Sequence, residues 1–428
     1  MLERLSMYHG LAIFLAVSLI FSLGFLGDGD DSAEQEFAQA ESDEADSSEE
    51  ETARQQVPCG TTVETDFQAL FPMPADDQWG YVNADGDWEI EPQWWRVNDF
   101  HEGRAVVKER RVRVRDNRPN DSGSWSVINT DGDSLLESGI SSEGVHRSDE
   151  PWGDRGIADY SESCAVIEAS SSYHWIDRDG QKWKAQQLSE DLADVEIGEV
   201  GSFSDGRVLI QHLQSTDDNF PDRKYGWLDR DGEFVSEPQF QDGGAFAEGK
   251  APVALDRREW TFVNEDGDIE FSDMELHRTW AFSQGWAPVR STSMDDDFNF
   301  AHIDHDGELM DLNSLGTDGE SRPGLAGVGS FNDNLAPIYV REDTGQVEGL
   351  VYIDTDGELA FEASEKAGAE ICNARSTPQF HQGRVRLLVA RDSDEGCGDE
   401  NFRAEFPTYE TARYIYLDTA GDKVLEAS

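Results

Sequence analysis

Apolar and polar residues alternate in short segments along most of this 428-residue chain. The pattern is clearest at 225–255, where YGWLD and EFVSE each alternate and DRDG joins them. Alternation with a period of two is typical of half-buried β-strands, and Asx-x-x-Gly between two such runs is typical of a hairpin. APVAL supplies a third strand in the same segment. Helical periodicity is nearly absent, with 188–200 as one weak helical segment, so the pattern predicts an all-β fold.

The hairpin sequence recurs eight times after residue 67. The copies are YVNADG (81–86), VINTDG (127–132), WIDRDG (175–180), WLDRDG (227–232), FVNEDG (262–267), HIDHDG (302–307), YIDTDG (352–357) and YLDTAG (416–421). Consecutive turn glycines lie 35 to 64 residues apart, a spacing typical of a repeat array.

A second motif, aromatic-x-x-Gly-x-small-x-apolar, lies between successive hairpins. It occurs as FHEGRAVV (100–107), FSDGRVLI (203–210), FAEGKAPV (246–253), FSQGWAPV (282–289) and FHQGRVRL (380–387). In the degenerate copies YSESCAVI (160–167) and FNDNLAPI (331–338), Ser163 and Asn334 replace the glycine. Because asparagine tolerates a left-handed backbone, the same turn is expected there.

The repeat predicts how the units pack. A three-stranded unit cannot bury both faces alone, so neighbours must stack. Closure as a β-propeller would protect the terminal edges, and seven aromatic-x-x-Gly-type segments suit a seven-bladed ring. We expect an all-β array of about seven to eight three- to four-stranded units, β-propeller-like, over residues 67–428. Only three clear strands are found per unit, which keeps an open curved stack of β units as the alternative.

The repeats resemble the WG-repeat (KWG-type) family over nearly everything after residue 67. The motifs that carry the resemblance are Trp79-Gly80-Tyr81-Val82-Asn83, Tyr225-Gly226-Trp227-Leu228-Asp229 and the Glu-Pro-Gln-aromatic pieces at 91–94 and 237–240. WG itself precedes a turn only at Trp79-Gly80, whereas Trp152-Gly153 falls elsewhere in its unit. The resemblance implies a divergent, β-rich repeat domain of a kind that is often exported and usually has no assigned activity.

The N-terminus predicts export. Arg4 precedes the uncharged run Leu11–Leu26, which is shorter than the roughly 20 apolar residues of a membrane span. We interpret 1–27 as a signal peptide, with an uncleaved signal anchor as the alternative. Residues 28–66 form an acidic linker, since 28–57 holds twelve Asp and Glu and too few apolar residues to offset the entropy of ordering.

Export makes the four cysteines candidates for disulfides. Three pairings are possible, and proximity favours Cys372 with Cys397 and Cys59 with Cys164. No CxxC sequence occurs, so nothing supports a zinc site or thioredoxin-like chemistry.

The net charge of −56 opposes general binding to nucleic acid or to an anionic membrane surface. One segment, KERRVRVRDNRP (108–119), has the opposite charge. On a strand, Arg111, Arg113 and Arg115 would share one face. An edge strand paired with acidic neighbours explains them, and a patch that docks an acidic partner is the functional alternative.

The Asx-x-x-Gly turns also suggest calcium, because two carboxylates flank one residue in four of the eight copies. A calcium loop of this type needs a further oxygen ligand two positions earlier, where this chain has aromatic residues such as Tyr352. YLDTAG also keeps Gly421 while Ala420 replaces the second carboxylate, which turn chemistry tolerates and coordination would not. The paired histidines His302 and His305 are three residues apart and would not share a strand face.

We therefore expect no catalytic, cofactor or metal site. The leading hypothesis is a non-enzymatic β-repeat interaction module, exported to the periplasm, cell surface or medium. It would bind a protein or polysaccharide on variable loops at one end, and it would touch the membrane only through an uncleaved N-terminal segment. The alternatives are a glycosidase-like enzyme that uses two loop carboxylates and a calcium-stabilised repeat scaffold.

Overall fold

The chain divides into two compact parts, Met1–Gln56 and Val57–Ser428, and the computed structural model describes residues of the second part. The described residues are 67–109, 123–136, 159–169, 172–214, 222–291, 300–312, 324–341, 347–372, 378–391 and 412–427, with the short pieces 59, 111–112, 119–120, 140–141, 315 and 397. The predicted segments 1–27 and most of 28–66 lie outside them. No helix among the described residues is long and apolar enough to cross a membrane.

The described residues form eight antiparallel units, which we call blades 1 to 8 in chain order. Blade 1 holds β1 (Phe71–Ala75), β2 (Gln78–Val82) and β3 (Trp88–Trp94); blade 2 holds β4 (Arg96–Val97), β5 (Arg104–Lys108), β8 (Ser124–Asn129) and β9 (Ile140–Ser141); blade 3 holds β10 (Cys164–Ala169), β11 (Ser172–Asp177) and β12 (Lys182–Trp183); blade 4 holds β13 (Ile197–Ser204), β14 (Arg207–Gln214), β15 (Asp222–Asp229) and β16 (Phe234–Phe240).

The second half of the array repeats this plan. Blade 5 holds β17 (Asp242–Gly243), β18 (Lys250–Ala254), β19 (Trp260–Asn264) and β20 (Ile269–Glu270); blade 6 holds β21 (Leu276–Thr279), β22 (Ala287–Ser291) and β23 (Phe300–Ile303); blade 7 holds β24 (Gly324–Val328), β25 (Leu335–Arg341), β26 (Val347–Asp354) and β27 (Leu359–Glu362); blade 8 holds β28 (Arg384–Ala390), β29 (Ala412–Asp418) and β30 (Lys423–Glu426). Blades 5 and 6 are joined by the single pairing of Trp260 with Leu276.

The few remaining elements lie in connections. They are the hairpin of β6 (Arg111–Val112) and β7 (Pro119–Asn120), the 3-10 turns η2 (Ala185–Gln187) and η3 (Glu190–Leu192), and the helix α2 (Ala363–Ala367). The weak helical segment expected within 188–200 is limited to the single 3-10 turn η3. Beyond η3 the chain enters β13 at Ile197, where Val200 and Phe203 pair with β14 and are buried.

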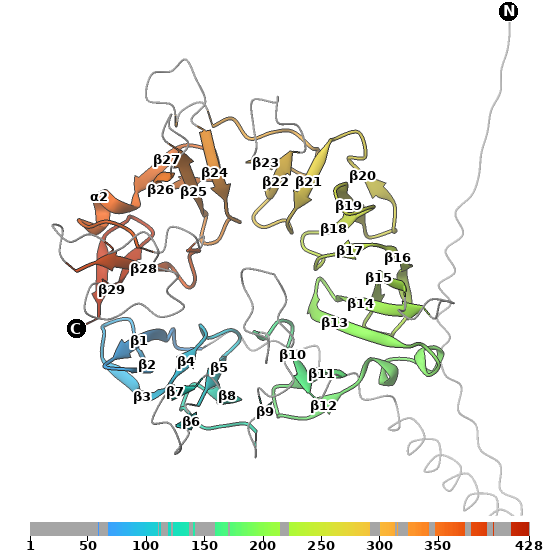
Figure 1. Cartoon of the computed structure of the whole chain (residues 1–428), viewed down its shortest axis with the longest axis horizontal. Coiled ribbons are helices and arrows are strands. Elements are labelled where there is room, and N and C mark those ends of the chain that lie inside the picture. The colour runs from blue at the N-terminus through green and yellow to red at the C-terminus, as the bar shows by residue number, and fades with distance from the viewer. Residues whose placement is uncertain are drawn as a thin grey trace, which may run out of the picture. The chain divides into compact units, whose positions relative to one another are not determined.

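Within Val57–Ser428 the blades follow one another around a common axis (Figure 1). Neighbouring blades bury apolar side chains between their sheets; for example, Trp175 of blade 3 and Phe203 of blade 4 are fully buried with ring centroids 5.1 Å apart. The same packing joins the two ends of the array. Phe71 and Met73 of blade 1 share a core with Tyr416 and Leu425 of blade 8. The array is therefore a closed, β-propeller-like ring, which decides against the open stack.

Each of the eight blades has one Asx-x-x-Gly hairpin, but only seven have an aromatic-x-x-Gly segment, because blade 1 differs from the others. Its first described strand, β1, pairs with β2 alone and has no inner partner among the described residues. Pro72 and Pro74 lack N–H groups, which suits a strand with one unpaired edge. The carbonyl oxygen of Pro72 accepts a hydrogen bond from the Tyr416 hydroxyl at 2.5 Å, so blade 8 covers part of that edge.

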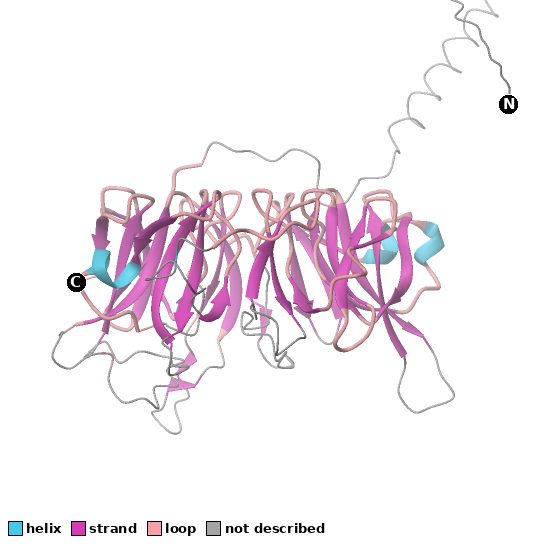
Figure 2. Ribbon diagram, turned by 90° about the horizontal axis from the view of Figure 1, so that it is seen from above, coloured by secondary structure: helices cyan, strands magenta, loops and turns pink. Residues whose placement is uncertain are grey.

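Since the strands are antiparallel, the connections alternate between two edges of the ring. We call the edge that carries both kinds of short turn the turn edge; Figure 2 shows short turns gathered along one edge of the standing strands. We call the opposite edge the loop edge; in each blade it carries the connection that leads into the strand before the Asx-x-x-Gly turn. These connections differ in length, from residues 76–77 in blade 1 to residues 391–411 in blade 8.

Candidate functional site

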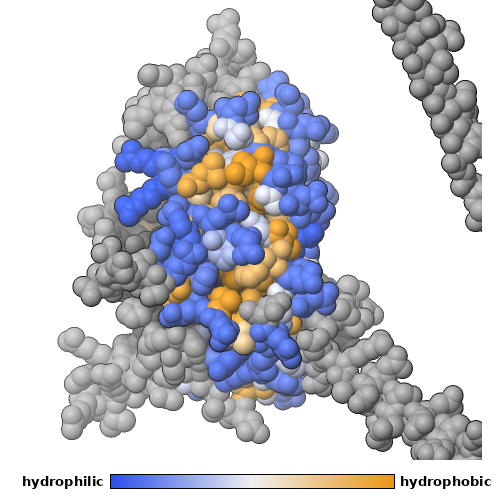
Figure 3. All heavy atoms as spheres, turned by 90° about the vertical axis from the view of Figure 1, so that its right-hand side faces the viewer, coloured by the Kyte–Doolittle hydropathy of each residue, from blue (hydrophilic) through white to orange (hydrophobic). Residues whose placement is uncertain are grey.

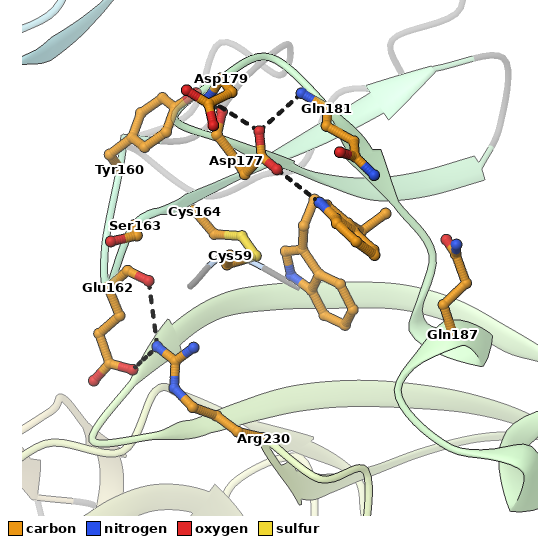
Figure 4. Close-up of a disulfide and its surroundings, with 12 residues drawn as sticks. Cys59, Tyr160, Glu162, Ser163, Cys164, Asp177, Asp179, Gln181, Gln187 and Arg230 are labelled. Carbon is orange, nitrogen blue, oxygen red and sulfur yellow. Dashed lines mark hydrogen bonds and ion pairs between the residues drawn. A yellow bond between two sulfur atoms is a disulfide. The ribbon is translucent and has the colours of Figure 1, made fainter. Parts of the chain in front are cut away.

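The eight Asx-x-x-Gly sequences form the same hydrogen-bonded turn. In blade 7, Asp354 Oδ1 accepts from the amides of Asp356 and Glu358 at 3.0 Å each, and the amide of Gly357 donates to the Asp354 carbonyl at 3.0 Å. Figure 4 shows the corresponding turn of blade 3, where Asp177 also accepts a bond from Trp183. The first residues of the eight turns are Asn83, Asn129, Asp177, Asp229, Asn264, Asp304, Asp354 and Asp418. Their side chains are therefore engaged by their own turns.

The calcium interpretation also conflicts with the position of the preceding aromatic residue. Tyr352, which stands where a calcium loop would place its first ligand, is fully buried and donates its hydroxyl to the carbonyl of Pro378 at 2.8 Å. Burial raises its pKa well above the usual value for tyrosine. Among the described residues, no group of three or more His, Cys, Asp or Glu is placed to hold a metal ion.

The seven aromatic-x-x-Gly-type segments form a second series of turns. Both central residues have positive φ, as in type I′ turns; in blade 2 the values are 50° for Glu102 and 71° for Gly103. The degenerate copies keep this geometry, with φ of 71° at Ser163 and 64° at Asn334. The prediction that these residues replace glycine in the same turn is confirmed.

Side chains of these type I′ turns connect one blade to the next. In each of the first six turns, the first central side chain accepts a hydrogen bond from the backbone of the following turn. The donor and acceptor pairs are Ser163 to Glu102, Gly206 to Glu162, Gly249 to Asp205, Gly285 to Glu248, Asn334 to Gln284, and Gly383 to Asp333. Gln382 of the seventh turn donates to the carbonyl of Phe100 at 3.2 Å and so returns to blade 2.

Charged side chains reinforce this series. Arg230, in the Asx turn of blade 4, binds Glu162 in the type I′ turn of blade 3 at 2.7 Å (Figure 4). Arg207 and Glu265 make the same kind of link between blades 4 and 5 at 2.9 Å. Most carboxylates of the type I′ turns therefore have hydrogen-bond or ion-pair partners within the protein.

A third series of hydrogen bonds runs through the core. The aromatic residue two positions before the Asx residue donates to a carbonyl on the innermost described segment of the next blade. The pairs are Tyr81 to Asn98 (2.8 Å), Trp175 to Gly201 (2.9 Å), Trp227 to Gly244 (3.0 Å), His302 to Gly329 (2.8 Å), Tyr352 to Pro378 (2.8 Å) and Tyr416 to Pro72 (2.5 Å). The alternating pattern did not predict this donor role, which the recurrence of Tyr and Trp over Phe at this position could have indicated.

Titratable side chains gather where blade 8 meets blade 2. The rings of His101 and His381 lie 4.5 Å apart, and His381 Nε2 is 2.8 Å from the carbonyl oxygen of Phe100. His101 Nε2 lies 3.7 Å from Asp159. Burial lowers the pKa of His101 and outweighs the opposing effect of Asp159. Each histidine contacts the chain around it, so the pair links blade 8 to blade 2 at the turn edge.

The structure describes part of the predicted arginine patch and both predicted disulfides. Arg111 lies in β6, paired with Asn120, whereas Arg113 and Arg115 lie outside the described residues. Cys372 is bonded to Cys397 and Cys59 to Cys164, with Cα–Cα distances of 5.3 and 5.2 Å. The second disulfide ties a residue that precedes blade 1 to the type I′ turn of blade 3 (Figure 4).

Apolar side chains are also exposed on the outer wall. Figure 3 shows apolar areas between polar ones on one side of the molecule. The large exposed hydrophobic residues among the described ones follow a turn glycine by two or three positions; they are Trp88, Ile269, Leu309, Leu359 and Val424. They occur one to a blade, in blades 1, 5, 6, 7 and 8.

The WG glycines have a structural explanation. A Cβ on Gly80 would lie 2.4 Å from the carbonyl oxygen of Ile90 and 2.7 Å from the nitrogen of Pro92, and the corresponding contacts of Gly226 have the same two lengths. Both glycines lie where the pairing with the outer strand shifts register. The Glu-Pro-Gln segment therefore packs directly on the WG backbone, which explains why the two motifs occur together.

A family model matches the two segments that contain these glycines. The model of the WG containing repeat matches residues 79–110 and 225–257, so the chain contains WG-type repeats at these positions. They include β2 to β5 in the first match and β15 to β18 in the second.

No curated protein matches the sequence. Among solved structures, apo AztD from Citrobacter koseri aligns with a TM-score of 0.41 at 10% identity, over 84% of this chain and 94% of that one. The β-propeller domain of the Trilobed protease from Pyrococcus furiosus gives 0.42 at 13% identity, over 76% and 94%. BamB from Moraxella catarrhalis gives 0.36 at 11% identity, over 77% and 94%. These similarities are too low to support an inference about activity or ligands.

Proposed function

We propose that this protein is an exported, non-enzymatic β-repeat scaffold that binds a protein or polysaccharide partner through its loop edge. The observation that carries the proposal is the contrast between the two edges. At the turn edge the same turns recur in every blade, and their polar groups are hydrogen-bonded within the ring. A surface on which the same hydrogen-bonded turn repeats from blade to blade offers little that distinguishes one partner from another.

The loop edge has the variety that recognition needs. Its connections differ in length and composition, and binding residues are commonly found on loops that a rigid scaffold positions. In blade 5 the connection 255–259 presents Arg257 and Arg258 as exposed side chains. In an otherwise acidic chain, such cations suit an acidic protein segment or an acidic sugar.

Export rests on the sequence. The apolar run Leu11–Leu26 and the acidic segment that follows it would deliver the ring to the cell envelope and hold it away from the membrane surface. Expression of the full chain with separate recovery of cytoplasm, envelope and medium tests this step. Recovery of the unprocessed chain in the cytoplasm would contradict it.

Partner binding is tested by affinity capture from envelope extract and by a panel of neutral and acidic glycans. The test pair lies in one blade: R257A/R258A removes two exposed charges from the loop edge, and D266N/D268N removes two exposed charges from the turn edge. We expect the first variant to weaken binding of the captured partner at least tenfold and the second to leave it unchanged. Equal loss in both variants, or no enrichment over a charge-matched acidic protein, would refute the proposal.

A further inference from the structure

One of the six core hydrogen bonds between blades is made by a residue that titrates near neutral pH. His302 on β23 takes the position that Tyr or Trp takes in the other five, and its Nε2 lies 2.8 Å from the carbonyl oxygen of Gly329 in blade 7. A carbonyl oxygen only accepts hydrogen bonds, so Nε2 carries the proton. The neutral ring then has its bare lone pair on Nδ1.

The surroundings of His302 leave no place for a second proton. The side chain is fully buried, and Nδ1 has no hydrogen-bond partner. The elements packed around it contribute Pro288 across the β22–β23 pair, the Phe331 ring at 5.1 Å, and the amide of Met310, which donates to the His302 carbonyl. None of these residues has a titratable side chain, and no described charged group contributes to its titration.

We propose that His302 makes the joint between blades 6 and 7 an acid-sensitive link of the ring. Protonation at Nδ1 would create both a buried positive charge without a counter-ion and a buried N–H donor without an acceptor. Opening of the joint removes both costs, because it exposes the imidazolium to water. It also breaks the hydrogen bond to Gly329. A tyrosine or tryptophan at this position keeps its proton throughout the acid range and gives a joint without this response.

The direction of the pH response follows from linkage. Burial lowers the pKa of His302 to about 4, against the ordinary value near 6.5, and the bond to Gly329 offsets this only in part. The open joint therefore takes up a proton at a higher pH than the closed joint does. Neutral His302 contributes its full stabilisation of the closed joint above about pH 6.5, and this contribution is lost as the pH falls towards 4. At pH 5 these two pKa values shift the joint towards opening by roughly 30-fold relative to pH 7.5.

Hydrogen exchange in the full chain tests the joint directly. Backbone amides of residues 300–303 and 329–331 are followed at pH 7.5 and pH 5, corrected for intrinsic exchange, in wild type and in H302Y, H302F and H305Q. We expect the opening constant of the joint to rise on the order of 30-fold on acidification in wild type and H305Q, and to rise much less in H302Y and H302F. The half-buried His305 is the matched control, because it lies in the turn of the same blade and its Nε2 faces Glu248 rather than a carbonyl of blade 7.

A second measurement keeps the proposal open to refutation if the His302 variants fail to fold. The exchange of the imidazole C2 proton, followed by mass spectrometry of the native wild-type chain, gives the pKa of His302 itself. A value well below 6.5 supports an acid-sensitive joint. A value at or above 6.5, or the same acid response in H302Y as in wild type, would overturn it.

Discussion

At the scale of single residues, the turn glycines are limited by two separate constraints. Gly357 has φ of +81°, and a Cβ there would lie 2.7 Å from the carbonyl oxygen of Asp311, in the preceding blade. Gly206 has φ of +69° but has nothing within 4 Å of the same position. The backbone conformation therefore favours glycine at both positions, and at Gly357 close packing against the Asp311 backbone leaves no room for a Cβ as well.

We predict that alanine at these glycines will separate the two constraints. G206A should lower the free energy of unfolding by about 1–2 kcal/mol, the cost of a left-handed backbone for a residue with a Cβ. G357A should cost clearly more, because the Asp311 segment must also move. Denaturant unfolding measures both, and G349A, at a position with open space around it, serves as the control that should change little. Equal losses in G206A and G357A would show that close packing between blades contributes nothing.

At the scale of elements, the Asx turns allow the structural and metal interpretations to be compared in one hairpin. Asp354 holds two backbone amides, whereas Asp356 is exposed and contributes only its amide. A calcium loop would need both carboxylates. A turn needs only the first.

We predict that D354A will lower the free energy of unfolding by about 1–2 kcal/mol, since two amides lose their acceptor. D356A should change it by less than about 0.5 kcal/mol, as expected for an exposed side chain. Melting temperatures measured in calcium and in chelator at one ionic strength complete the test, and we expect no difference. A calcium-dependent rise in wild type that both variants abolish would restore the metal interpretation.

The same hairpins show why some elements could be predicted from the sequence and others could not. The Asx turns and the two strands beside them carry their own signal, because alternation and turn residues are local. The innermost strands carry little signal, since β4 and β17 are only two residues long. The contacts of Glu102 and His302 are made with the next blade, so they have no signature in the local sequence.

At the scale of the whole ring, closure depends on the same hydrogen bonds that join neighbouring blades. Tyr416 bonds to Pro72 as Tyr352 bonds to Pro378, although Tyr416 and Pro72 are separated by 344 positions in the chain. Phe71 packs edge-on against Tyr416 with ring centroids 5.7 Å apart, and Arg384 of blade 8 donates to the carbonyl of Ala84 in blade 1 at 2.8 Å. A ring closed in this way has no terminal blade that can fray freely.

We predict that Y416F will loosen the closure while Y352F, which loses an equivalent bond inside the array, will act locally. Each should cost about 0.5–1.5 kcal/mol of stability, the usual contribution of one hydrogen bond. Hydrogen exchange distinguishes them. In Y416F protection should fall in β1–β3 and β28–β30 together, because these sheets share one core. In Y352F it should fall in blades 7 and 8 while β1–β3 stays protected. Loss of protection confined to blade 8 in Y416F would mean that blade 1 is held by its contacts with blade 2 alone, and that the ring does not depend on its closing bond.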